Sequence, residues 1–178
     1  AAEALDAAGL APISLVEKEG LAVTNGTDAI LGMLCLAIDD SERLLQQADM
    51  VTALTVEGLL ATDGPFAADL QALRPQPGQA ISAANLRALL HDSPIVASHK
   101  IDDSRVQDAY SVRCTPAVHG AARDTLDHVR RVAGYELASA IDNPMVLPDG
   151  RVESCGNFHG APLGFAADFL AIALAEVG

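Results

Sequence analysis

The chain has 178 residues, enough for one compact domain or for a part of a larger one. Half of the residues are hydrophobic but only 3% are aromatic and Trp is absent, so we expect a core of small residues, mainly Ala and Leu, packed between helices. The 24 acidic residues outnumber the 11 basic ones, and the net charge of −13 argues against binding to nucleic acid or to an anionic membrane surface.

Helical patterns dominate the first third of the chain. Residues 1–27 predict a short amphipathic piece followed by a loop. Thr27 is typical of a helix N-cap, and a helix is predicted over residues 28–48. A second helix is predicted over residues 50–60, because Gly64-Pro65 interrupts the pattern soon afterwards. Five residues of the first helix are expected to face the core: Ile30, Leu34, Ile38, Leu44 and Leu45.

The middle of the chain is richer in loop signals. Residues 66–78 end in Arg-Pro-Gln-Pro-Gly and predict a rigid loop. Ser82 is predicted to cap a helix that runs to Leu90. Residues 91–114 are predicted to form a second loop region.

The last third again predicts helices, with one interruption. Pro116 suits the first turn of a helix over residues 116–139, which the pair Asn143-Pro144 would end. A small hairpin is predicted over residues 145–154 and a last helix over residues 162–177. Three arginines of the first of these helices are expected to be solvated: Arg123, Arg130 and Arg131. The predicted fold class is therefore all-α, a bundle of long helices with a minor β-hairpin.

The cysteines and histidines bear on location and metal binding. Cys35, Cys114 and Cys155 are widely spaced without a C-x-x-C pair, which is typical of reduced thiols rather than of a disulfide framework or a zinc site. The five histidines show no metal-binding spacing. The sequence has no basic start followed by an apolar run, and its longest apolar run, residues 29–38, is too short to span a bilayer. We expect a cytoplasmic protein without a metal ion.

The segment from Val106 to Cys114 carries the clearest chemistry. Gln107, Tyr110 and Arg113 recur every three residues, so a helical turn would present all three on one face. Arg113 offers a planar fork that matches a carboxylate, Tyr110 a phenol and Gln107 an amide. The set suits a pocket for an α-amino acid. Spacing alone leaves ordinary alternatives open: an arginine at a helix start, a half-buried structural tyrosine and a loop amide.

Four other residues are weaker candidates. Asn25 lies in an Asn-Gly pair, which by itself indicates a turn. Phe158 is one of four phenylalanines and could simply pack in the core. Asn143 is expected to satisfy backbone groups in its own turn, and His159 to be a satisfied histidine beside a helix start rather than a base.

Four segments of the chain resemble segments of the aromatic amino acid ammonia-lyases, and among these the bacterial histidine-specific members. They are Lys18–Asp28 (KEGLAVTNGTD), Val106–Cys114 (VQDAYSVRC), Asp142–Pro144 (DNP) and Gly156–Pro162 (GNFHGAP). The resemblance implies a homotetramer of long helices that deaminates L-histidine non-oxidatively to urocanate and ammonia.

The resemblance also implies roles for individual residues. Arg113 would bind the substrate carboxylate, with Asn25 and Gln107 beside it. Asn25, Gln107 and Tyr110 would form hydrogen bonds to the cofactor and to anionic intermediates. Phe158 would flank the cofactor and help to seat it.

The cofactor implied by the resemblance is methylidene-imidazolone, which these enzymes form from an Ala-Ser-Gly segment of their own backbone. This sequence contains no Ala-Ser-Gly, and the nearest string, Ser154-Cys155-Gly156, has cysteine in the central place. In the family the tripeptide and the base tyrosine lie upstream of the matching region, so residues 1–178 are expected to be a middle portion of a longer chain. The apolar pattern of the last helix is also unfinished at Gly178. We expect the isolated chain to be inactive.

Two alternatives stay open. The residues that read the substrate ring lie mostly outside the chain, so a phenylalanine or tyrosine ammonia-lyase, or an aminomutase, is the nearest alternative. A catalytically inert helical oligomerisation module is the alternative from another class.

Overall fold

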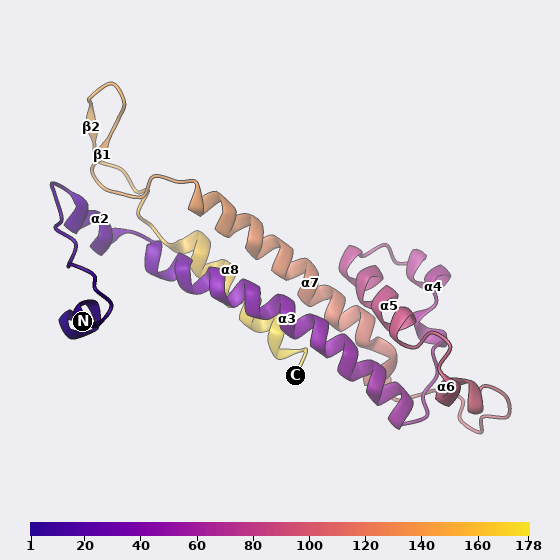
Figure 1. Cartoon of the computed structure of the whole chain (residues 1–178). Coiled ribbons are helices and arrows are strands. Elements are labelled where there is room, and N and C mark those ends of the chain that lie inside the picture. Colours follow the sequence, from indigo (N-terminus) through magenta and orange to yellow (C-terminus); the bar gives the residue numbers. More distant parts are fainter.

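The computed structural model describes residues 1–178, and two long antiparallel helices form its axis (Figure 1). These are α3 (Asp28–Gly58) and α7 (Tyr110–Leu137), which contact each other along the bundle. Helix α8 (Ala161–Ala175) packs on both of them towards one end, and α5 (Pro77–Leu89) packs on α7 towards the other. At 1.5 Å per residue, α7 is about 42 Å long, so the molecule is elongated.

Short elements close the two ends of the bundle. The end where α3 begins, called the hairpin end here, carries α1 (Ala2–Ala7), α2 (Glu19–Asn25), β1 (Met145–Val146) and β2 (Val152–Glu153). The opposite end, called the α6 end, carries the 3-10 helix η1 (Gly64–Phe66), α4 (Ala68–Ala72) and α6 (Pro94–Ser98). The two strands pair antiparallel, with Met145 opposite Glu153.

The apolar core has two parts along the axis. A cluster of 11 buried residues, with Leu45, Val129 and Leu163 fully enclosed, joins α3, α7 and α8. A second cluster of eight surrounds Phe66 and Leu86 at the α6 end. Both consist mainly of Leu, Val and Ala, as the composition predicts.

A polar layer in the middle of the bundle ties α3, α5 and α7 together. Asp49 of α3 is 1% exposed, and its Oδ1 accepts a hydrogen bond from His119 Nδ1 at 2.8 Å. Its Oδ2 accepts from Arg123 Nη2 at 2.6 Å and from Asn85 Nδ2 at 2.7 Å. Arg123 Nε donates to Ser82 Oγ at 2.9 Å. Since the partners come from three helices, the layer fixes how the helices are aligned along the axis.

The all-α fold class, the hairpin and the last helix are as predicted, whereas two details of α3 are not. The predicted break between residues 48 and 50 is absent, because Asp49 finds partners on α5 and α7 and nothing there interrupts the helix. Ile30 and Leu44 were expected inside and are exposed. Leu34, Ile38 and Leu45 are buried as predicted.

The predicted starts of two helices are also wrong. Helix α5 begins at Pro77, where proline suits the first turn, and Ser82 lies buried in its middle instead of capping it. Helix α7 begins at Tyr110 and continues through Pro116. Pro116 removes one backbone donor, but Pro116 and Val112 are buried against the neighbouring helices, which holds the turn in place.

Three short helices lie in segments that were predicted as loops, namely α2, α4 and α6. Arg123 was predicted to be solvated and instead belongs to the buried polar layer. Arg130 and Arg131 are largely exposed and pair with Glu42 and Asp127.

Large apolar side chains remain exposed on the bundle. They include Met33, Leu36 and Leu54 of α3 and Phe165 and Ile172 of α8. By length and composition, no single helix of the chain could cross a membrane; only α2 and α3 taken together pass such a test, with a bend of 52° between them.

Candidate active site

The first turn of α7 carries two of the three residues singled out in the segment from Val106 to Cys114. Tyr110 is the first residue of α7 and Arg113 lies one turn further. Gln107 lies in the loop before the helix, so the three do not continue one helical face as the spacing predicts. They still remain close along the chain, at the α6 end of the bundle.

Arg113 is half-buried and has no acidic partner. Its Nε donates to the backbone carbonyl of Asp108 at 3.1 Å, and its guanidinium carbon lies 5.8 Å from the centre of the Tyr110 ring. Most other cationic side chains of this acidic chain pair with a carboxylate. The terminal nitrogens Nη1 and Nη2 of Arg113 have no hydrogen-bond partner within the chain, which suits them to an external carboxylate.

Tyr110 and Gln107 are exposed and their polar atoms are free. The side chain of Tyr110 is 75% exposed, and its hydroxyl makes no hydrogen bond within the chain. The side-chain amide of Gln107 is likewise exposed and without a partner. Arg113 and Tyr110 contact each other, and Gln107 lies three residues before Tyr110 in the loop. Their free guanidinium, phenol and amide groups are donors suited to an anionic ligand.

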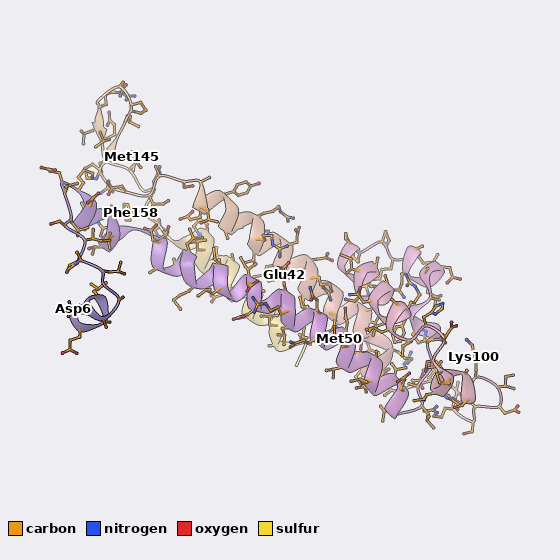
Figure 2. All side chains as sticks on the ribbon, in the orientation of Figure 1. Asp6, Glu42, Met50, Lys100, Met145 and Phe158 are labelled. Atoms are coloured by element: carbon orange, nitrogen blue, oxygen red, sulfur yellow. The ribbon has the colours of Figure 1, made fainter.

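Asn25 and Phe158 lie at the hairpin end instead. Asn25 is the last residue of α2 and its side chain is exposed. A Cβ on Gly160 would lie 3.8 Å from Thr27 Cγ2, so the loop that carries Phe158 runs beside the junction of α2 and α3. Phe158 is 38% exposed, and Figure 2 shows it at this end of the molecule.

A lysine fixes the backbone of the hairpin end. Lys18 precedes α2 in the left-handed conformation, with a φ of 68°. Its Nζ lies 2.7 Å from Asp142 Oδ2 and donates to the carbonyl of Pro144 at 2.8 Å. The hydrogen bond from Lys18 is the main reason that the pKa of the Asp142 carboxyl lies below its ordinary range. Lys18 therefore joins the start of α2 to the segment before the hairpin.

Asn143 and His159 have the structural roles predicted for them. Asn143 Oδ1 accepts hydrogen bonds from Cys155 N at 2.9 Å and from Ser154 Oγ at 3.3 Å, across a turn with a cis peptide bond before Pro144. His159 Nδ1 accepts from the backbone N–H of Ala161 at 3.2 Å, at the start of α8. Neither arrangement indicates a base.

The two groups of site residues lie at opposite ends of the chain's long axis. Thr27 Oγ1 donates to Glu136 Oε1 at 2.6 Å, so Asn25 lies near the last turns of α7. Arg113 lies 23 residues before Glu136 on the same helix, which corresponds to about 35 Å. One copy of the chain therefore cannot place Asn25 and Arg113 in a single pocket.

Comparison with known proteins identifies the family. The profile of the aromatic amino acid lyases matches residues 1–178. The chain belongs to this family. It is 58% identical, over all 178 residues, to a histidine ammonia-lyase from Streptomyces coelicolor, and it spans 35% of that protein's length.

Two solved structures have the same fold as this member of the family. A tyrosine aminomutase from Streptomyces globisporus has a TM-score of 0.86 and 38% identity, covering 99% of this chain and 37% of its own. A histidine ammonia-lyase from Trypanosoma cruzi has a TM-score of 0.81 and 38% identity, covering 99% of this chain and 32% of its own. The family and the helical bundle expected from the four motifs are therefore confirmed.

Sequence reasoning missed two residues that anchor the segments carrying the candidate site residues. Lys18 and Asp108 lie inside the quoted motifs, yet only their contacts with distant segments show that they anchor loops. A sequence signal existed for Asp108, a charged residue next to the candidate Gln107, whereas Lys18 lies seven residues before Asn25 and had no such signal. No group of three or more His, Cys, Asp or Glu side chains is arranged to hold a metal ion.

Proposed function

We propose that the protein to which this chain belongs deaminates L-histidine non-oxidatively to urocanate and ammonia. The observation that carries the proposal is the 58% identity to a histidine ammonia-lyase across the whole chain, including the segments with Asn25, Arg113 and Phe158. Since the chain spans only 35% of that relative, the activity is proposed for the longer protein, with residues 1–178 as its middle portion.

In this proposal Arg113 binds the substrate carboxylate through its free terminal nitrogens. A charge-assisted pair of hydrogen bonds fixes both the position and the orientation of the carboxylate. Positioning of this kind can lower the barrier of a reaction by several kcal/mol. Gln107 of the same chain and Asn25 of another copy of the chain add hydrogen bonds around the same substrate.

The residues of this chain fit the methylidene-imidazolone cofactor of the family. Tyr110 and Asn25 offer exposed polar groups without partners, and the half-exposed ring of Phe158 offers an apolar flank. The cofactor supplies an electrophile that activates the amino group of the substrate for departure. Tyr110, Gln107 and Asn25 would stabilise anionic charge near it through hydrogen bonds. We expect the 178-residue chain alone to make no urocanate, because it contains no Ala-Ser-Gly.

We also propose a cytoplasmic homotetramer whose sites combine residues from more than one subunit. The support is the separation of about 35 Å between the ends that carry Asn25 and Arg113, with the exposed apolar side chains of α3 and α8. Antiparallel packing of two such elongated chains would bring opposite ends together.

A second candidate is a tyrosine or phenylalanine ammonia-lyase, or an aminomutase. The TM-score of 0.86 to a tyrosine aminomutase favours it, because the shared fold and the free Arg113 fork would serve any amino acid carboxylate. The identity to that protein is lower, at 38%.

The test is to purify the full-length protein and to measure its products with L-histidine, L-phenylalanine and L-tyrosine. We expect urocanate from histidine, with a kcat/KM at least about tenfold above that for the other two substrates. Formation of cinnamate, coumarate or a β-amino acid as the main product would instead support the second candidate.

A further inference from the structure

Asp108 is the most deeply buried charged side chain near the proposed carboxylate site. Only 5% of its side chain is exposed, although the flanking residues Gln107 and Ala109 are exposed. Its Oδ2 accepts two hydrogen bonds from Thr62, one from the backbone N at 2.8 Å and one from Oγ1 at 2.9 Å. Thr62 follows the C-terminal end of α3, so Asp108 fastens the loop before α7 to the end of α3.

A second side chain of the loop strengthens this attachment. Arg105 Nη1 donates to the carbonyl of Leu59 at 3.0 Å, and its Nη2 donates to the carbonyl of Leu60. The same Nη1 lies 3.7 Å from Asp108 Oδ1. Carbonyls at the end of a helix lack partners within the helix, so these bonds both cap α3 and hold the loop.

The attachment reaches Arg113 through the backbone. The carbonyl oxygen of Asp108 accepts the hydrogen bond from Arg113 Nε at 3.1 Å. Because Nε already donates to this carbonyl, the guanidinium can bind a carboxylate through two hydrogen bonds only with Nη1 and Nη2. The burial of the Asp108 side chain therefore determines where these two nitrogens lie.

We propose that Asp108 is a positioning residue for substrate recognition: its bonds to Thr62 hold its carbonyl against Arg113, so that Arg113 binds the substrate carboxylate through Nη1 and Nη2. This inference rests on the proposed function, because it requires that the substrate is an amino acid whose carboxylate binds Arg113. It assigns to Asp108 no contact with the substrate.

The test uses variants of the full-length enzyme. Asp108→Ala removes both hydrogen bonds to Thr62 and leaves the bonds from Arg105 to the end of α3 in place. Asp108→Asn retains an acceptor for the Thr62 N–H, and Thr62→Val removes only the hydroxyl donor. The matched control is Asp124→Ala, because Asp124 of α7 also accepts a backbone hydrogen bond from another helix, from Gly78 N at 2.9 Å, but far from Arg113. Melting temperature and oligomeric state are measured for every variant.

The readout is the inhibition constant for two ligands that share a ring and differ in one group. 3-(Imidazol-4-yl)propionate carries a carboxylate, and histamine does not. We expect Asp108→Ala to weaken binding of the carboxylate ligand on the order of 10- to 100-fold and to leave histamine within about twofold, since a misplaced fork harms only the carboxylate contact. Asp108→Asn and Thr62→Val should lie between wild type and Asp108→Ala. Asp124→Ala should lower the melting temperature without changing the ratio of the two constants.

The outcomes separate this inference from the proposed function. If the wild type prefers phenylalanine or tyrosine, the assignment of histidine as substrate fails. The two inhibitors are then 3-phenylpropionate and phenethylamine, and the ratio of their inhibition constants tests the role of Asp108 in the same way. If the wild type is active and none of the folded variants, Asp108→Asn and Thr62→Val included, changes the ratio, only the inference about Asp108 is overturned. A wild type that binds neither pair overturns both.

Discussion

Arg113 and Arg123 lie ten residues apart on α7 and have opposite electrostatic surroundings. Arg123 is mostly buried and its Nη2 lies 2.6 Å from Asp49, so its charge is neutralised inside the bundle. Arg113 has only one backbone acceptor and an aromatic ring beside it. Replacing Arg123 or its partner Asp49 should therefore lower the stability of the fold. Replacing Arg113 should instead weaken substrate binding.

In the full-length enzyme, we expect Arg113→Ala to reduce kcat/KM by an amount equivalent to about 2–5 kcal/mol of transition-state stabilisation. The melting temperature should barely move, because the side chain makes one hydrogen bond within the chain. Arg113→Lys should restore activity only in part, since an ammonium group cannot reproduce the two-point contact. A structural role for Arg113 would show the reverse pattern, with a lower melting temperature and an unchanged rate in the folded fraction.

Asp49→Ala should be severely destabilising, because it leaves Arg123 buried without its carboxylate partner. Breaking a buried ion pair from one side typically costs about 3–5 kcal/mol of unfolding free energy. The matched control is Asp127→Ala, which breaks the exposed pair with Arg131 and should cost about 0.3–0.5 kcal/mol. Urea unfolding of the full-length protein measures both, and equal losses would contradict the role given to the polar layer.

The stabilisation by Asp49 should also depend on pH. Burial raises the pKa of the Asp49 carboxyl, but the hydrogen bonds from His119 and Asn85 and the charge of Arg123 together outweigh burial and lower the pKa below its ordinary value of 3.8. The unfolded chain then takes up the proton at a higher pH than the folded one. The contribution is therefore complete above the ordinary pKa and is lost as the pH falls through the folded-state pKa. The difference in the free energy of unfolding between wild type and Asp49→Ala should therefore shrink below about pH 4.

At the scale of the elements, the periodic interiors of helices could be predicted from sequence and several boundaries could not. Pro116 reads locally as a helix start, yet burial against neighbouring helices lets α7 begin six residues earlier, at Tyr110. The sequence predicts separate helices before and after Asp49, whereas α3 is continuous there and Asp49 is bound by partners from two other helices. The chemistry of Gln107, Tyr110 and Arg113 followed from residue type, whereas the distance to Asn25 depends on the tertiary arrangement.

The contact between α5 and α7 depends on two glycines that face each other. A Cβ on Gly120 would lie 2.7 Å from the carbonyl carbon of Gly78 and closer still to the backbone of Gln79. We expect Gly120→Ala to destabilise the protein by roughly 1–3 kcal/mol, because backbone atoms must move apart. Gly134→Ala on the same helix is the control: its Cβ would meet nothing within 4 Å, so it should stabilise by about 0.4–1 kcal/mol. Thermal unfolding measures the stability of both variants. An unchanged stability of Gly120→Ala would show that α5 and α7 can move apart without loss of stability.

At the scale of the whole molecule, the chain is an elongated rod (Figure 2), and different candidate residues lie at its two ends. Arg113 and Tyr110 lie at the α6 end, and Asn25 and Phe158 lie at the hairpin end. Exposed apolar side chains of α3 and α8 lie between these ends. Assembly of several rods would cover this apolar surface and could bring unlike ends into one site, which a single chain cannot do.

Mixed oligomers test this arrangement directly. Full-length Asn25→Ala and Arg113→Ala should each have little activity alone. When the two are co-expressed and assemble at random, about a quarter of the sites should receive an intact Asn25 from one subunit and an intact Arg113 from another, and activity should return in that proportion. The control pair is Tyr110→Phe with Arg113→Ala: these residues contact each other within one chain, so each site receives both from the same subunit and none is repaired. Recovery in the first pair and not in the second supports shared sites. Equal failure of both pairs, in oligomers shown to contain both variants, would place Asn25 and Arg113 in different sites or in none.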